Sequence, residues 1–267
     1  MPVVLTDQSA ANKAVVLWDN IFEGVEYISL GEDPVNPAQN ALNDSTFDFW
    51  RNGSSSPNTT IRKTGSVARS ADALGVSGHN LATTGSTIRL RRSSDLVNWT
   101  DVFSPYAPIT NDDLLFIFPV ENNTYWEVLF GTSTSAYVSN IKLGRRLEFP
   151  CTPVVGYKPT HHSRKYTKYF NNSVEGHLLG NRVMSSGGTT TVDFPEIPRS
   201  FVDGSMLGFE DHYNRGRSFF YAGWPGGKPQ DMAYAWADGE EAMIDVTYTG
   251  GDKLATVGFG MSLFYGR

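Results

Sequence analysis

Short strand-like segments separated by turn-forming residues are the pattern that most limits how this 267-residue chain can fold. In the segment 86–91, Ile88 and Leu90 alternate with arginines, which places apolar and charged side chains on opposite faces of a strand. The run 114–118 is apolar throughout, as is typical of a strand buried on both faces. Short strands at regular spacing, with turns between them, favour an all-β sandwich or barrel.

Further segments have the same strand character, and few have the character of a helix. Strand-like runs follow at 125–130, 137–143, 189–194, 242–248 and 255–265. The segment 201–213 fits one short helix, although Gly204 and Gly208 each disfavour it by roughly 1 kcal/mol relative to alanine. The sequence therefore predicts an all-β protein with little helix.

Two prolines close together, Pro150 and Pro153, would interrupt a strand ladder. We therefore expect a domain boundary there, with one β-rich domain over 1–150 and a second over 151–267. The chain has a single cysteine, Cys151, so no intramolecular disulfide can form and the fold has to rest on its apolar core.

The overall charge and the distribution of apolar residues exclude two classes of partner. A net charge of −6 disfavours broad binding to nucleic acid through a basic face. No window approaches 18 consecutive apolar residues, so we expect no insertion into a membrane. The first residues lack the basic and apolar regions of a secretory signal, and we expect none.

Three stretches of the first half occur in a characteristic order. The stretch 43–51 is an acidic turn followed by an aromatic residue, 74–81 is an apolar strand followed by a Gly-His-Asn loop, and 137–149 is a closing strand. Together they resemble the galactose-binding-like, or discoidin-type, sandwich that many phage tail proteins contain. The resemblance implies an N-terminal jelly-roll sandwich that binds or assembles rather than catalyses.

Stretches of the second half carry a related resemblance. The segments 174–182, 219–225 and 231–240 are similar to the second half of phage tail-tip proteins of this size. The resemblance implies a structural component of a phage tail tip or baseplate, located in the virion tail and assembled in the host cytoplasm. Its partners would be further copies in a symmetric ring and other tail or baseplate proteins. A host-surface glycan-binding (receptor-binding) tail protein and a capsid decoration or tail-fibre protein are the alternatives.

Glycan binding by the N-terminal sandwich would need an aromatic face and fixed polar groups at the loop ends. The candidates are Asp44, Trp50, Arg51, His79 and Asn80. A competing interpretation is that Trp50 and Trp99 pack in the core. In that interpretation His79 and Asn80 hold a turn through hydrogen bonds to the backbone.

Catalytic and metal sites find little support in the sequence. The turn 43–46 offers one aspartate, whereas calcium takes six to eight oxygen ligands. The histidines lack the spacing of a zinc site, and the segment 75–79 lacks the full pattern of a nucleophile elbow. No spacing singles out a pair of carboxylates. We therefore expect no catalytic residue, no metal and no cofactor, and a protein that is not an enzyme.

The densest basic region combines positive charge with aromatic side chains. Such a mixture suits either nucleic acid or a protein interface. The acidic chain favours an interface between subunits, and aromatic residues of the C-terminal half extend the expected surface. The interface candidates are Lys158, Arg164, Lys165, Tyr166, Lys168, Trp224 and Trp236.

Overall fold

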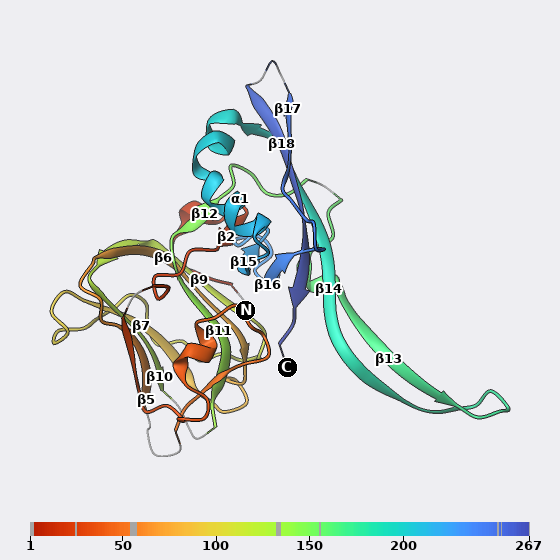
Figure 1. Ribbon diagram of the computed structural model, residues 1–267, viewed down its shortest axis with the longest axis horizontal. Helices are drawn as coiled ribbons and strands as arrows, with labels where there is room; N and C mark the ends of the chain where they lie inside the picture. Colours follow the sequence, from red (N-terminus) through yellow and green to blue (C-terminus); the bar gives the residue numbers. More distant parts are fainter. Residues whose placement is uncertain are drawn as a thin grey trace.

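The computed structural model describes residues 3–24, 26–53, 58–131, 135–154, 156–249, 251 and 253–266. Strands dominate the described chain, which confirms the all-β prediction. They form two five-stranded sheets and one eight-stranded sheet, and a long hairpin projects from the body (Figure 1).

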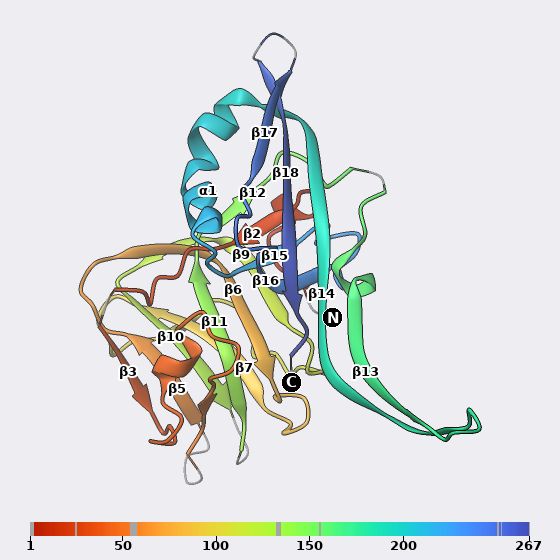
Figure 2. The same ribbon diagram turned by 45° about the vertical axis from the view of Figure 1, so that its right-hand side comes forward.

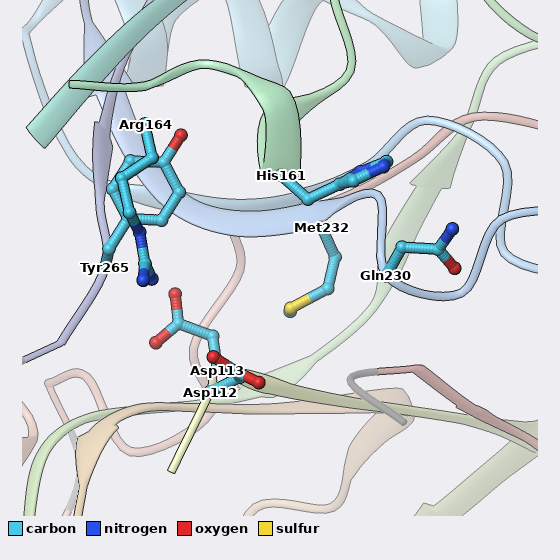
Figure 3. Close-up of a pocket in the computed structure, with 7 residues that line it drawn as sticks. All are labelled: Asp112, Asp113, His161, Arg164, Gln230, Met232 and Tyr265. Carbon is cyan, nitrogen blue, oxygen red and sulfur yellow. The ribbon is translucent and has the colours of Figure 1, made fainter. Parts of the chain in front are cut away.

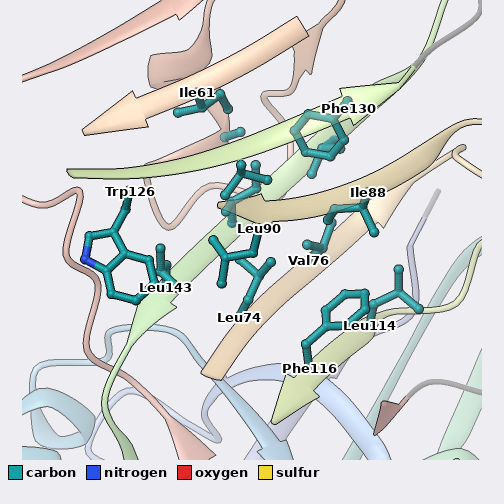
Figure 4. Close-up of a cluster of buried hydrophobic side chains, with 14 of the residues drawn as sticks. Ile61, Leu74, Val76, Ile88, Leu90, Leu114, Phe116, Trp126, Phe130 and Leu143 are labelled. Carbon is teal, nitrogen blue, oxygen red and sulfur yellow. The ribbon is translucent and has the colours of Figure 1, made fainter. Parts of the chain in front are cut away.

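The first two sheets face each other and form the N-terminal sandwich. The first sheet has the order β1 (Val3–Leu5), β9 (Leu114–Asn123), β6 (Arg69–His79), β11 (Tyr137–Gly144) and β4 (Trp50–Arg51). The second has the order β3 (Tyr27–Leu30), β5 (Asn58–Lys63), β10 (Tyr125–Gly131), β7 (Thr87–Ser93) and β8 (Thr100–Asp101). Leu74 and Phe116 of the first sheet share a buried core with Leu90 and Trp126 of the second (Figure 4). The predicted sandwich is confirmed.

The third sheet collects strands from both ends of the chain. Its order is β12 (Arg146–Glu148), β2 (Val15–Leu17), β15 (Phe219–Ala222), β16 (Met232–Ala237), β18 (Leu254–Phe264), β14 (Leu178–Pro198) and β13 (Arg164–Asn172). A further strand, β17 (Asp245–Thr249), pairs with β18. Because β2 and β12 lie in this sheet, the predicted domains 1–150 and 151–267 are not separate in their strand pairing.

The first sheet is the middle layer of a three-layer stack. Along β9, Phe116 points into the sandwich core, whereas Leu115 and Ile117 lie in a second core with Phe220 and Tyr234 of the third sheet. Alternate side chains of a strand point to opposite faces, so an apolar run is the consequence of burial on both. This confirms the prediction for residues 114–118.

The far face of the third sheet is covered by the predicted helical segment. It comprises a π-helical turn, Phe201–Ser205, and the α-helix α1, Leu207–Asn214. Phe209 and Tyr213 of the helix pack edge-on against Phe259 of β18. Short 3₁₀ turns stand at Gln8–Ala10, Ala38–Ala41 and Thr160–His162. Among the described residues, no helix has the length and apolar character needed to span a membrane.

Strand β14 runs out of the body and forms the projecting hairpin with β13 (Figure 2). Its C-terminal part pairs with β18 and its N-terminal part only with β13. The change occurs at Gly188, which pairs with both Arg164 and Leu263. A Cβ at Gly188 would lie 2.5 Å from the carbonyl oxygen of Ser163, so the crowded root of the hairpin requires glycine. We call residues 164–186 the arm.

Candidate functional site

The arm exposes its side chains on both faces. Every residue from 164 to 186 is exposed except Ser173, which is half-buried. The large apolar side chains exposed there are Tyr166, Tyr169, Phe170, Val174, Leu178, Leu179, Val183 and Met184. An isolated two-stranded hairpin is marginally stable in water, and a concentration of exposed apolar side chains marks an interaction surface. The arm therefore has the properties of a segment that a partner covers.

The arm and its root also carry a charge opposite to that of the body. Residues 158–188 include five Lys or Arg residues and one Glu, a net charge of +4 within a chain of −6. The rest of the chain therefore carries −10. Complementary charge of this kind speeds association and favours the correct partner.

Five of the predicted interface residues lie together in this region, and two lie elsewhere. Arg164, Lys165, Tyr166 and Lys168 are exposed on β13, and Lys158 is exposed in the loop that leads to it. In contrast, the exposed Trp224 follows β15 and the half-buried Trp236 belongs to β16. The structure thus groups the basic residues and places the two tryptophans on the body.

A cavity of 230 Å³ lies at the root of the arm (Figure 3). It is lined by Asp112, Asp113, His161, Arg164, Gln230, Met232 and Tyr265. The guanidinium of Arg164 stacks on the Tyr265 ring at 4.4 Å, and the Tyr265 hydroxyl donates to the carbonyl of Thr160 at 2.6 Å. These contacts attach the first residue of the arm to the C-terminal segment.

The floor of this cavity joins the sandwich to the third sheet. The buried Asp113 carboxylate accepts from the Ser77 hydroxyl at 2.6 Å and, through its other oxygen, from the backbone N–H of Tyr234 at 3.0 Å. Burial raises the pKa of Asp113 to about 6. Because its two oxygens accept from β6 and β16, the Asp113 carboxylate holds two layers together.

Two of the predicted glycan-binding residues are core residues. Trp50 is completely buried and stacks near Phe130 at a ring distance of 4.8 Å, so its indole offers no face to a sugar. His79 is 3% exposed, and burial lowers its pKa to about 4. We therefore correct the prediction for Trp50 and His79. Trp99, by contrast, lies outside the core, beside the guanidinium groups of Arg62 and Arg91.

Asn80 and Arg51 serve the local structure of the sandwich. The side chain of Asn80 donates to the Ser135 carbonyl at 2.9 Å and accepts from the Tyr137 N–H at 2.8 Å, which fixes the turn as the competing interpretation required. Arg51 is half-buried and its guanidinium lies over the Phe49 ring at 5.4 Å. The five predicted residues do not form one exposed site.

Asp44 lies between the sandwich and the third sheet. One carboxylate oxygen accepts from the Lys142 ammonium at 2.8 Å and from the Ser218 hydroxyl, and the other from Arg217 at 3.3 Å. Burial alone would raise the pKa of this carboxyl, but the adjacent Lys142 charge and hydrogen bonds hold it at about 2. A carboxylate surrounded by cations is a poor calcium ligand. No group of three His, Cys, Asp or Glu residues in the described chain is placed to hold a metal.

The sequence did not single out the two buried carboxylates nearest the arm. Asp113 precedes an apolar run, and Asp231 precedes β16. Asp231 is completely buried and accepts from the N–H and hydroxyl of Thr160 at 2.8 and 3.1 Å. Burial raises the pKa of Asp231 to about 6. An aspartate at the start of a strand usually lies in a solvated turn, so only the tertiary fold reveals their burial.

Comparison with known proteins gives a likeness of fold. No protein-family model matches the chain, and no curated protein matches it. A solved pectin-binding carbohydrate-binding module is 13% identical over 45% of this chain and 88% of its own, with a TM-score of 0.37. Chitosan-binding module 1 of a Paenibacillus sp. IK-5 chitosanase/glucanase is 16% identical over 46% of this chain and 97% of its own, with a TM-score of 0.38.

A larger protein matches over a similar share. A putative α-L-fucosidase from Bacteroides thetaiotaomicron is 9% identical over 47% of this chain, which spans 28% of that protein, with a TM-score of 0.41. At these identities and scores the likeness concerns the β fold alone.

Proposed function

We propose that this chain is a structural subunit that assembles with copies of itself through its arm, as part of a phage tail tip or baseplate. The observation that carries the proposal is the arm itself, a hairpin exposed along residues 164–186 that bears both large apolar and basic side chains. The free energy of the system falls when another molecule covers such a surface and removes its apolar side chains from water.

A second copy of the chain is the partner that the charges favour. The arm region carries +4 and the remainder of the chain −10, so the arm of one subunit is attracted to the body of the next. A contact between an arm and a different surface is heterologous, and heterologous contacts close into rings when the rotation permits. A ring of this kind fits the phage tail role that the sequence resemblance implies.

Size-exclusion chromatography with light scattering tests self-association. The wild-type chain is expected at a multiple of 29.4 kDa. A variant with Phe170→Ser and Leu179→Ser loses apolar side chains from both arm strands and is expected to shift to the monomer mass, because the lost contact area is apolar. High salt is expected to weaken the assembly as well.

A matched control uses apolar residues away from the arm that are even more exposed than Phe170 and Leu179. Val97→Ser with Ile109→Ser changes side chains that are 79% and 80% exposed and is expected to leave the mass unchanged. A monomeric wild-type chain at all concentrations would contradict self-association. Immunogold microscopy of purified phage particles checks the tail role separately, and a chain absent from the particles would contradict that role alone.

The second proposal is the alternative role of a receptor-binding tail protein that binds a host-surface glycan. The sandwich carries Trp99 outside its core, a half-buried aromatic group of the type that sugars contact, with two arginine side chains over its ring. Glycan binding by the Trp99 face is compatible with a structural ring. A glycan array with the wild-type chain and a Trp99→Ala variant tests it.

A further inference from the structure

A second cavity, distinct from the one beneath Arg164, combines an aromatic side wall with unpartnered polar groups. It has a volume of 300 Å³ and lies between the loop residues 152–154 and 156–159 and the turn 223–231 that joins β15 to β16. Its lining residues are Thr152, Pro153, Val154, Gly156, Tyr157, Pro159, Trp224, Lys228 and Asp231. The volume is at the lower end of the range for small-molecule sites.

The tryptophan of this cavity is held in one orientation. The Trp224 indole N–H donates to the Asn12 side chain at 3.2 Å. Gly227 packs directly against the indole, since a Cβ there would lie 2.2 Å from Trp224 Cε2. Trp224 nevertheless remains 38% exposed. A fixed, partly exposed indole is the group on which the C–H face of a sugar ring stacks.

Polar atoms without partners converge beside the tryptophan. Asp231 is completely buried, and its Oδ2 atom has no hydrogen-bond partner although Oδ1 has two. The hydroxyl of Tyr157 is also unpartnered. A Cβ on Gly223 would lie 2.4 Å from the Tyr157 hydroxyl and 2.5 Å from Asp231 Oδ2, so glycine allows both polar atoms to approach the backbone at this point. Buried polar groups of this kind normally have partners.

We propose that this cavity binds one neutral pyranose unit of a glycan. The ring stacks on Trp224, one sugar hydroxyl donates to Asp231 Oδ2, and another exchanges a hydrogen bond with the Tyr157 hydroxyl. The ammonium of Lys228, which lies 5.9 Å from the Trp224 ring centre, supplies a donor at the rim. Because Asp231 is completely buried, this contact requires neighbouring side chains such as Tyr157 to move when the sugar binds.

Other ligand classes fit the same groups less well. The Asp231 carboxylate on the floor repels phosphate and nucleotide ligands, and a single carboxylate falls short of the oxygen ligands that calcium takes. The Lys228 ammonium disfavours an organic cation. A neutral polyhydroxylated ring uses the acceptor, the donors and the aromatic face together.

Saturation-transfer NMR on the full chain tests the proposal. The probes are the methyl glycosides of glucose, galactose and mannose, and N-acetylglucosamine. Transfer is expected to at least one of them. Trp224→Ala and Asp231→Asn are each expected to weaken that binding about tenfold or more, equivalent to about 1.4 kcal/mol. Asp231→Asn retains the acceptor for Thr160 and replaces only the unpartnered oxygen with a donor.

Two matched pairs keep the test specific. Gly223→Ala places a methyl group between Tyr157 and Asp231 and is expected to abolish binding, whereas Gly180→Ala meets open space and is expected to preserve it. Trp99→Ala removes the half-buried tryptophan that lies outside the sandwich core and is expected to leave binding unchanged. Thermal unfolding confirms that each variant is folded.

Three results would overturn the proposal. They are the absence of transfer to every probe, undiminished binding in both Trp224→Ala and Asp231→Asn, and loss of binding in Trp99→Ala alone. The measured mass of the assembly is independent of these outcomes, so failure of this site and failure of self-association are distinguishable.

Discussion

At the scale of single residues, the junction between the sandwich and the third sheet depends on buried charges. Lys142 projects from β11 with a side chain only 4% exposed, and its ammonium is paired with Asp44. Asp44 in turn accepts from Ser218, which precedes β15. Removal of one member of a buried pair leaves the other charge uncompensated, which costs more than the pair contributes.

Asp44→Ala is therefore expected to lower the free energy of unfolding by about 2–3 kcal/mol, the lower part of the range for buried pairs because Asp44 itself is a third exposed. Asp211→Ala is the control, since its ion pair with Arg215 is exposed and contributes little. Urea denaturation measures both variants. Equal stability of the two would contradict a structural role for the Asp44–Lys142 pair.

Asp231 makes a contribution to the pH dependence of stability that one substitution can isolate. Its pKa in the folded chain is about 6, above the ordinary 3.8, so the folded state binds more protons between these values. Stability from this group is therefore present at low pH and is lost as pH rises from about 4 to about 6. Asp231→Asn is expected to be more stable than wild type at pH 7, by up to about 3 kcal/mol, and similar at pH 4.

Denaturant titrations of wild type and Asp231→Asn at several pH values measure whether the stability difference between them grows as pH rises. Asp44 contributes in the opposite direction, because its pKa of about 2 lies below the ordinary value and its stabilisation is lost only as pH falls from about 4 to about 2. The two effects occupy different pH windows. A gap between wild type and Asp231→Asn that grows as pH falls would contradict the assignment.

Local sequence could indicate what Asn80 does but could not tell which tryptophans are in the core. A Gly-His-Asn turn predicts side-chain to backbone bonds, and Asn80 makes them. Trp50 lies in β4, whereas Trp99 lies just before β8 and outside the core. Trp50 is completely buried, whereas an arginine guanidinium lies over the Trp99 ring. Which tryptophan is buried depends on contacts with strands that are distant in sequence.

At the scale of elements, the close approach of sheets one and three requires a glycine in β6. Gly75 faces the ring of Phe220 in β15, and a Cβ at Gly75 would lie 2.3 Å from Phe220 Cδ2. The two sheets therefore pack more closely here than any side chain would allow.

Gly75→Ala is expected to lower the free energy of unfolding by at least about 2 kcal/mol, because neither the Phe220 ring nor the backbone of β6 can move freely in a packed interior. Thermal or urea unfolding measures the change. Gly180→Ala, on the arm, has no atom within 4 Å and is expected to alter stability little. A neutral Gly75→Ala would show that the layers are more loosely packed than described.

The strands of the body could be predicted from periodicity, whereas most of the arm could not. The prediction at 189–194 covers the part of β14 that pairs with β18, where buried and exposed residues alternate. The rest of β14 passes through Gly180, Gly187 and Gly188, and glycine normally weakens a strand. Because neither face of the outer hairpin is buried, its sequence lacks the alternation of apolar and polar residues by which a strand is recognised.

At the scale of the whole molecule, the sandwich and the third sheet share a buried core, and we expect them to unfold as one cooperative unit. Val15 and Leu17 of β2 share a core with Leu115 of β9 and Phe220 of β15. The linker prolines near 150 correctly mark the end of β12 but do not separate two independent bodies. Sequence alone could not show this, because the pairing of β2 with β15 joins residues about 200 positions apart.

A fragment of residues 1–150 is therefore expected not to fold as an independent sandwich. It would expose the face of the first sheet that carries Leu115 and Ile117, together with the edge of β2 that pairs with β15 in the full chain. We expect strong binding of the dye ANS and a broad, early thermal transition compared with the full chain. A fragment with a sharp transition and no dye binding would contradict a single cooperative unit.

The position of β2 also determines the order in which the protein can mature during synthesis. Val15–Leu17 is made about 130 residues before β12, its neighbour on one side. Its neighbour on the other side, β15, is made about 70 residues later still. The apolar strand thus lacks its second partner while about 200 residues are synthesised, and we expect the nascent chain to be prone to association with other chains until β15 is released.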